Sequence, residues 1–124
     1  DALYKIKPQF NVNKIAQVCA IESLKDKSFI KKSIKHNLDW AKKIKNTMNL
    51  YNIKTNEIGP NFFLLDFKNC KYSANFVEKK LEASGIILRE MNSYGIKNCL
   101  RLTIGNNYEN NLLLNKLKNI FKNV

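Results

Sequence analysis

The sequence has few glycines, cysteines and histidines, and each shortage excludes a class of site. Its four glycines form neither a GxGxxG nor a GxxxxGK pattern, so no glycine-rich loop is available to bind a phosphate. The three cysteines are widely spaced and form no CxxC pair, and His36 is the only histidine, which excludes the common zinc sites. The same odd set of cysteines argues against a disulfide framework, so a reducing, cytoplasmic location is the default expectation.

Long apolar runs are missing as well. No stretch of about 20 apolar residues is present, so we expect no membrane-spanning segment. No apolar segment near the start is typical of a signal peptide. The 124 residues, 44% of them hydrophobic, fit one domain with its own core. Because the chain opens at Asp1 and not at a methionine, we expect residues 1–124 to be a single domain of a longer protein.

Acidic residues are outnumbered, and the formal net charge is +12. Such a charge usually indicates a nucleic-acid or membrane-surface partner. The lysines are scattered, however, and their densest groups lie on one predicted helix over residues 27–51, where they form a solvated face. The predicted strands carry no RNA-binding signature and no GxxG loop is present, which argues against an RNA-binding protein. Because of the net charge, a basic RNA-binding α+β module is kept as an alternative from a different class.

Arginine is the scarcest charged residue. Of the 22 basic residues, all but Arg89 and Arg101 are lysines. If lysine serves wherever a plain positive charge is enough, an arginine indicates a site that needs a planar fork, which binds carboxylate or phosphate through two parallel hydrogen bonds. No lysine lies in a recognisable Schiff-base context, and Asp66 is isolated in its predicted strand. These features favour a domain that holds a substrate while the chemistry takes place elsewhere.

The spacing of apolar residues predicts the order of helices and strands. An extended lead-in over residues 1–12 contains Pro8, which disfavours helix just before it. The predicted elements that follow are helices over 13–25 and 27–51, a turn over 52–60, a strand over 62–67, a helix from Ser73 to Gly85, strands over 86–91 and 99–104 around a loop at 92–95, and a helix over 108–122. This order predicts a two-layer α+β domain in which helices cover a small, mostly antiparallel sheet.

The two arginines lie on two of these predicted strands. Arg89 is near the end of the strand over 86–91, and Arg101 lies inside the strand over 99–104. Because only a short loop separates the strands, we expect them to be neighbours, with two guanidinium groups converging on one anion. The alternative is a pair of surface arginines on a sheet edge.

Three segments together match a known pattern. KPQFNVNKIAQVCA, GPNFFLLDF and GIILREMNSYGIKNCLRLTIGNNYEN follow one another along nearly the whole chain. The third segment has a Gly-hydrophobic-hydrophobic-x-Arg strand, a Tyr-Gly loop and a Leu-Arg-hydrophobic-Thr-hydrophobic-Gly strand. In order and spacing, the chain resembles the C-terminal small domain of histidinol-phosphate aminotransferases, which are fold-type I pyridoxal-phosphate-dependent enzymes. Residues 1–12 would then lead in from a large domain.

This resemblance implies a substrate-binding role for the arginines. Arg101 matches the arginine that binds the carboxylate of glutamate or 2-oxoglutarate and the phosphate of histidinol phosphate. Arg89 matches a second arginine that joins it on the phosphate. Pyridoxal phosphate would be bound by the missing large domain, so no catalytic, cofactor-binding or metal-binding residue is assigned to this chain.

The resemblance also implies the setting of the activity. The parent would be a transferase of L-histidine biosynthesis, a cytoplasmic homodimer that acts on small molecules without a nucleic-acid or membrane partner. Its small domain would close over bound substrate, and the fragment alone would be inactive. A domain of an aromatic amino acid aminotransferase or of a threonine-phosphate decarboxylase shares the Leu-Arg-hydrophobic-Thr strand, and both remain alternatives.

Overall fold

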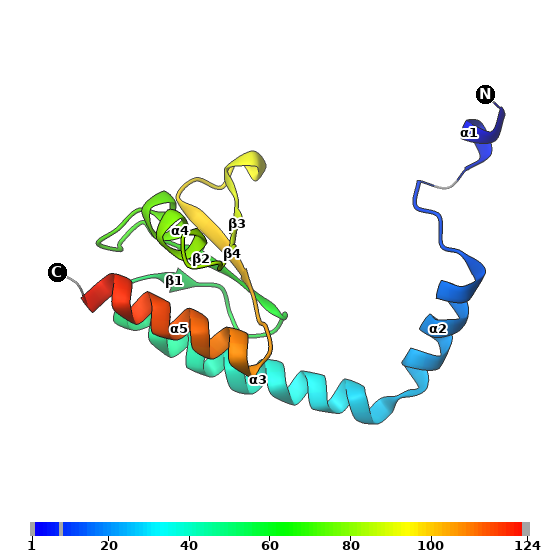
Figure 1. Cartoon of the computed structure of the whole chain (residues 1–124), viewed down its shortest axis with the longest axis horizontal. Helices are drawn as coiled ribbons and strands as arrows, with labels where there is room; N and C mark the ends of the chain where they lie inside the picture. Colours follow the sequence, from blue (N-terminus) through cyan, green and yellow to red (C-terminus); the bar gives the residue numbers. More distant parts are fainter. Residues whose placement is uncertain (1, 8, 123–124) are drawn as a thin grey trace. The chain divides into compact units, whose positions relative to one another are not determined.

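The computed structural model describes residues 2–7 and 9–122 and divides the chain into two compact units. The first unit runs to Ile34, and the second begins at Lys35, within the long helix α3 (Lys27–Leu50). Figure 1 shows the helices and strands that make up each unit. No helix in the described ranges is long and apolar enough to cross a membrane.

The first unit consists of helices that are fixed by local capping. The predicted helix over 13–25 is confirmed as α2 (Lys14–Lys25), whose first turn is capped by the Asn13 side chain, which accepts a hydrogen bond from the Ala16 amide (2.8 Å). The start of α3 is capped by Asp26, which accepts a hydrogen bond from the Phe29 amide (2.9 Å). The extended lead-in expected over 1–12 differs from the structure at residues 2–6, which form the short helix α1 (Ala2–Ile6). Residues 1 and 8 lie outside the described residues.

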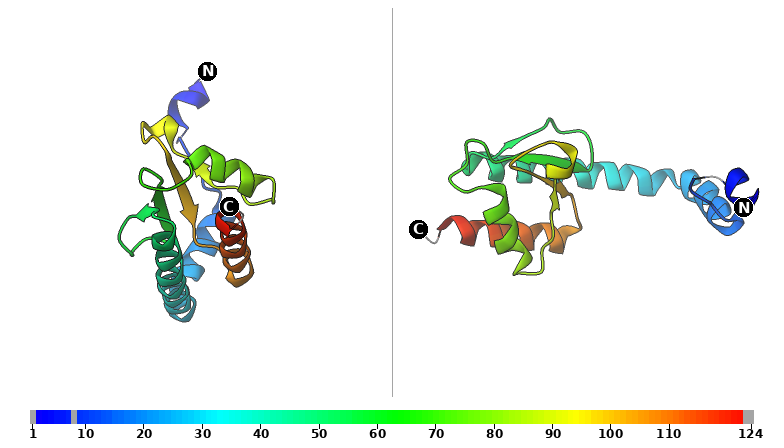
Figure 2. Two further views of the ribbon diagram at one scale, coloured as in Figure 1. Left: turned by 90° about the vertical axis from the view of Figure 1, so that its left-hand side faces the viewer. Right: turned by 90° about the horizontal axis from the view of Figure 1, so that it is seen from above.

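The second unit contains a four-stranded antiparallel sheet in the order β1-β2-β4-β3. Its strands are β1 (Lys54–Thr55), β2 (Phe62–Asp66), β3 (Arg89–Glu90) and β4 (Cys99–Thr103). The helices α4 (Ala74–Glu82) and α5 (Asn107–Lys122) complete the two-layer α+β architecture together with α3. The predicted fold class is therefore confirmed, and Figure 2 shows the helices packed along the sheet.

One face of the sheet forms the core with the three helices. Phe63 and Leu65 of β2 lie opposite Leu102 and Leu100 of β4, and all four side chains are buried. The helices α3 and α5 run side by side (Figure 1). At one end the Trp40 indole donates a hydrogen bond to the Asn107 side chain (2.7 Å), and at the other end the rings of Tyr51 and Phe121 stack. Helix side chains complete the core, among them Ile44, Met48, Val77, Leu81, Leu113 and Leu117.

The strand predicted over 86–91 is shorter in the structure. The chain leaves α4 through Gly85, which has a left-handed φ of 77°, and the Ile86 amide still donates to the Leu81 carbonyl (3.0 Å). Because this hydrogen bond holds Ile86 at the end of α4, the chain does not pair with β4 before Arg89. The two-residue strand β1 was not predicted, because Lys54–Thr55 lies in a polar stretch that contains no alternating pattern.

Two other expectations concern reactive side chains. The position of His36 among the lysines of the predicted helix over 27–51 predicts that it is exposed to solvent. In the structure it is half-buried instead, and its Nε2 atom lies 2.9 Å from the Gly105 carbonyl oxygen. All three cysteines are free thiols, as predicted: Cys19 is exposed, Cys70 is half-buried and Cys99 is buried. The thiol of Cys99 has a raised pKa because burial, and to a smaller extent the nearby Asp66 carboxylate, disfavours the thiolate.

Candidate anion-binding site

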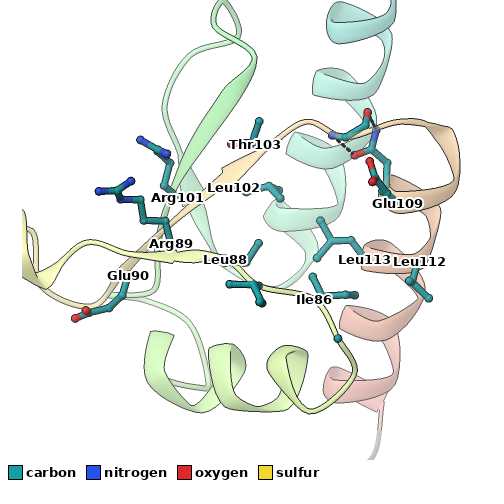
Figure 3. Close-up of a pocket in the computed structure, with 14 residues that line it drawn as sticks. Ile86, Leu88, Arg89, Glu90, Arg101, Leu102, Thr103, Glu109, Leu112 and Leu113 are labelled. Carbon is teal, nitrogen blue, oxygen red and sulfur yellow. Dashed lines mark hydrogen bonds between the residues drawn. The ribbon is translucent and has the colours of Figure 1, made fainter. Parts of the chain in front are cut away.

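The sheet register places the two arginines directly opposite each other. Arg89 of β3 pairs with Arg101 of β4. Successive residues of a strand point to opposite faces, so Arg101 lies on the face opposite the buried Leu100 and Leu102. Figure 3 shows both guanidinium groups extending to the same side of the two strands, whereas the Glu90 carboxylate points the other way. The expected neighbouring position of the two arginines is confirmed.

Each guanidinium group has an aromatic neighbour. The Cζ atom of Arg89 lies 5.4 Å from the centre of the Tyr94 ring, and its Nη2 atom donates to the Tyr94 hydroxyl at 2.6 Å. The Cζ atom of Arg101 lies 5.8 Å from the centre of the Phe62 ring. Both separations are within the range of cation–π interactions. Aromatic contacts stabilise the cations without neutralising them, so the positive charge of the pair is retained.

The pair has no acidic partner in the described part of the chain. The three salt bridges found there all use lysines, namely Lys25, Lys35 and Lys45. The Nε atom of Arg101 is buried and, among residues 2–7 and 9–122, has no hydrogen-bond partner. Like charges opposite each other on a sheet are unfavourable, and a buried donor without a partner costs free energy. An anion bound between the two arginines would relieve the repulsion between their charges.

A pocket with a volume of about 740 Å³ contains both arginines, and its size is typical of sites for small ligands. Figure 3 shows that its other end is apolar, formed by Ile86, Leu88, Leu102, Leu112 and Leu113. Glu90 and Glu109 also line it. The Glu90 carboxylate points away from the arginines (Figure 3), and the Glu109 carboxylate accepts a hydrogen bond from the Asn106 amide (2.8 Å) and caps α5. The pocket therefore combines a cationic end with an apolar end.

Pyridoxal phosphate does not fit the residues of this pocket as a covalently held cofactor. No lysine is among the pocket residues, so none is available there to form a Schiff base. The described residues also contain no group of three side chains that could hold a metal ion. What the pocket residues can do chemically is bind and orient an acidic small molecule.

A second, smaller cavity of about 270 Å³ has the opposite charge. It is lined by Glu78 and Glu90 next to the buried Cys99. The pKa of Glu78 is raised, first by burial and then by the charges of Glu90 and Glu82. Its lining contains no arginine or lysine, so this cavity does not suit an anionic ligand.

Sequence reasoning found the two arginines but missed Tyr94 and Phe62 as their neighbours. Tyr94 lies in the loop that joins the two arginine strands, which is the only signal that could have pointed to it. Phe62 reaches Arg101 because its position on β2, opposite Thr103, is on the same face of the sheet. That register is a long-range property that no local pattern reveals.

The fold is that of part of an aminotransferase. The histidinol-phosphate aminotransferase of Clostridium acetobutylicum matches 98% of this chain with a TM-score of 0.77 at 23% identity, and the chain covers 37% of it. A decarboxylase from Sulfurospirillum multivorans matches 98% of the chain with a TM-score of 0.73 at 25% identity, and 36% of it is covered. No family model matches the chain.

The chain is also similar in sequence to curated histidinol-phosphate aminotransferases. A histidinol-phosphate aminotransferase from Pelagibacter ubique is 49% identical over 98% of this chain, and one from Campylobacter hominis is 34% identical over 97%. The chain spans about a third of the length of these relatives, 34% and 32% respectively. By sequence the chain is therefore similar to about one third of a histidinol-phosphate aminotransferase.

Proposed function

We propose that the chain is the C-terminal small domain of a pyridoxal-phosphate-dependent histidinol-phosphate aminotransferase, and that its arginine pair binds the acidic group of the substrates. The observation that carries this proposal is the register pairing of Arg89 with Arg101, with the Arg101 Nε–H left without a partner in the described residues. The names of the relatives supply the reaction type, amino transfer, and one substrate, histidinol phosphate. As the other substrate of the exchange we propose 2-oxoglutarate or glutamate.

The two acidic groups differ in what they require. The carboxylate of glutamate or 2-oxoglutarate has two oxygens and one charge, which one guanidinium fork can satisfy. The phosphate of histidinol phosphate has three terminal oxygens and nearly two charges at neutral pH. Arg101 therefore binds the acidic group of both substrates, and Arg89 joins it on the phosphate. The apolar end of the pocket lies against the rest of the substrate.

The remaining parts of the reaction lie outside this chain. When bound by the large domain of the parent enzyme, pyridoxal phosphate would supply an electron sink for amino transfer. The residues of this chain bind the substrate, orient it and help to exclude water when the small domain closes. The parent works as a cytoplasmic homodimer in L-histidine biosynthesis, and the fragment alone does not transaminate.

Kinetics of the full-length enzyme test the arginine roles. Arg101→Lys keeps the charge but removes the fork, so we expect kcat/KM to fall on the order of 10- to 100-fold for both substrates. Arg89→Gln should lower kcat/KM for histidinol phosphate and leave glutamate nearly unchanged. Lys118→Gln, an exposed charge on α5, is the matched control for loss of one positive charge. Unchanged kinetics in both arginine variants would remove the proposed function.

A decarboxylase activity is the second candidate, because a decarboxylase is among the structures with this fold. It would use the same arginine pair to hold an acidic substrate such as threonine phosphate. Release of CO₂ from threonine phosphate by the full-length enzyme, without amino transfer to 2-oxoglutarate, would favour this candidate.

An RNA-binding module is the alternative from a different class, and it is tested by salt titration against single-stranded RNA. Tight, sequence-tolerant binding in this titration would contradict both enzyme proposals.

A further inference from the structure

We infer that Tyr94 is a positioning residue that holds Arg89 for a phosphate group and so makes the site discriminate phosphate from carboxylate. This inference rests on the proposed function, because it assumes that Arg89 binds the substrate. It concerns a residue outside the arginine pair itself, and its evidence is the contact between the Tyr94 hydroxyl and Arg89.

Arg89 needs a contact that fixes its side chain. It is exposed and lies in a strand of only two residues at the edge of the sheet. A long, exposed arginine populates several rotamers, and ordering it opposes ligand binding. The hydrogen bond of 2.6 Å to the Tyr94 hydroxyl, together with the ring 5.4 Å from Cζ, holds the guanidinium group at the side of Arg101.

The loop around Tyr94 is closed by backbone hydrogen bonds. The amides of Tyr94 and Ile96 both donate to the carbonyl of Met91, whose side chain is buried. Gly95 follows with a left-handed φ of 74°, a conformation that favours glycine, and its amide donates to the Asn92 carbonyl (2.9 Å). The backbone that carries the Tyr94 ring is thus held by hydrogen bonds to the carbonyls of Met91 and Asn92.

The chemistry of the contact favours phosphate. The Tyr94 hydroxyl accepts a hydrogen bond from Arg89, which leaves its own proton available for an anionic oxygen. A carboxylate held by the Arg101 fork has both oxygens engaged. A phosphate held by the same fork still presents a further oxygen, which the Arg89 guanidinium and the Tyr94 hydroxyl can share. Tyr94 therefore contributes to phosphate binding and leaves carboxylate binding unaffected.

Steady-state kinetics of the full-length enzyme test this role. Tyr94→Phe removes the hydroxyl and keeps the ring, so we expect the KM for histidinol phosphate to rise about tenfold with kcat nearly unchanged, and the KM for glutamate to stay constant. Tyr94→Ala removes the ring as well and should raise the same KM further. Tyr108→Phe is the matched control, since Tyr108 is an exposed tyrosine on α5.

A double-mutant cycle separates this inference from the proposed function. In an Arg89→Gln background, Tyr94→Phe should have no additional effect on histidinol phosphate, because its partner is absent. If Arg89→Gln raises the KM for histidinol phosphate but Tyr94→Phe does not, the role of Tyr94 is wrong and the proposed function stands. Equal losses for histidinol phosphate and glutamate in Tyr94→Phe would contradict the selectivity. If both arginine variants behave as wild type, the proposed function itself fails.

Discussion

The two units of the chain both contain large apolar side chains but bury them to very different extents. In the second unit Ile44, Val77 and Leu113 are almost completely buried, with exposed fractions of 0%, 0% and 3%. In the first unit Ile15 and Leu24 are 77% and 69% exposed, and α2 has no buried residue. Local capping therefore marks where α2 and α3 begin, whereas a core requires non-local pairing, which among the described residues is found in the second unit.

Helix α2 differs from α3, α4 and α5 in its pattern as well as in its burial. Its apolar residues lie on every side of the helix, so it has no polar face opposite an apolar one. A helix of this pattern is typical of one that is covered by other protein. In the second unit the apolar residues of α4 and α5 lie on one side and face the sheet, as for Leu81 and Leu117.

The largest expected effect in this comparison is the cost of truncating a core leucine. Leu100 is completely buried between the strands and helices of the second unit, so Leu100→Ala should lower the free energy of unfolding by about 2–5 kcal/mol. Leu24→Ala, in the first unit, should change it by less than about 0.5 kcal/mol. Urea unfolding of the 124-residue chain measures both, and equal losses would contradict the difference between the units.

Amide hydrogen exchange should show the same division along the backbone. Amides of β4 and α5 open only with the whole second unit, so their exchange should be on the order of a thousandfold slower than that of α2 amides. The 12 residues of α2 form a helix that is marginal in isolation. Mass spectrometry of peptides from the two units resolves the rates, and comparable protection in both would show that α2 has a stabilising partner within the chain.

The helix caps of the two units should respond differently to acid. The pKa of Asp26 is lowered by hydrogen bonds from the Phe29 amide and the Ser28 hydroxyl, so the ionised carboxylate is favoured in the folded helix. This capping contribution is present above the ordinary value of 3.8 and is lost as the pH falls through the lowered pKa. Ser73, which caps α4, does not titrate. Backbone NMR shifts at the start of α3 should therefore titrate between about pH 5 and pH 2 with the lowered pKa of Asp26, whereas the Ser73 cap of α4 contributes no such titration.

The smallest effect is expected at Glu78 in the second cavity. Because its folded-state pKa is raised, its ionised form is less favourable in the fold, and stability falls as the pH rises from the ordinary value of 4.5 through the raised one. Glu78→Gln should then raise the melting temperature slightly at about pH 7 and have little effect below about pH 4. A melting-temperature series over this range checks the sign, and a lower melting temperature at neutral pH would show that the charge stabilises the fold.

Local signals predicted most of the elements correctly. The helices α2, α3 and α4 begin within one residue of the predicted positions 13, 27 and 73. The neighbouring position of Arg89 and Arg101 was predictable because a short loop joins their strands. Strand β1 and the late start of β3 pairing were not, because both depend on how far the backbone of β2 and β4 extends beside them.

The surroundings of the arginines were the least predictable part of the site. The contact between Arg89 and Tyr94 depends on the conformation of the loop at 92–95, which forms a short 3₁₀ helix ending at Gly95. The contact between Arg101 and Phe62 depends on the register of β2 against β4. Neither the side-chain rotamers of a loop nor the register between strands that are distant in sequence can be read from residue spacing.

The most direct test of the central claim is a crystal structure of the full-length enzyme with histidinol phosphate bound. We predict that the phosphate oxygens lie about 3 Å from the guanidinium nitrogens of both Arg89 and Arg101, with the Arg101 Nε–H or its fork occupied. A phosphate bound elsewhere, with the two arginines left facing solvent, would contradict the assignment of this pair as the substrate-anion site.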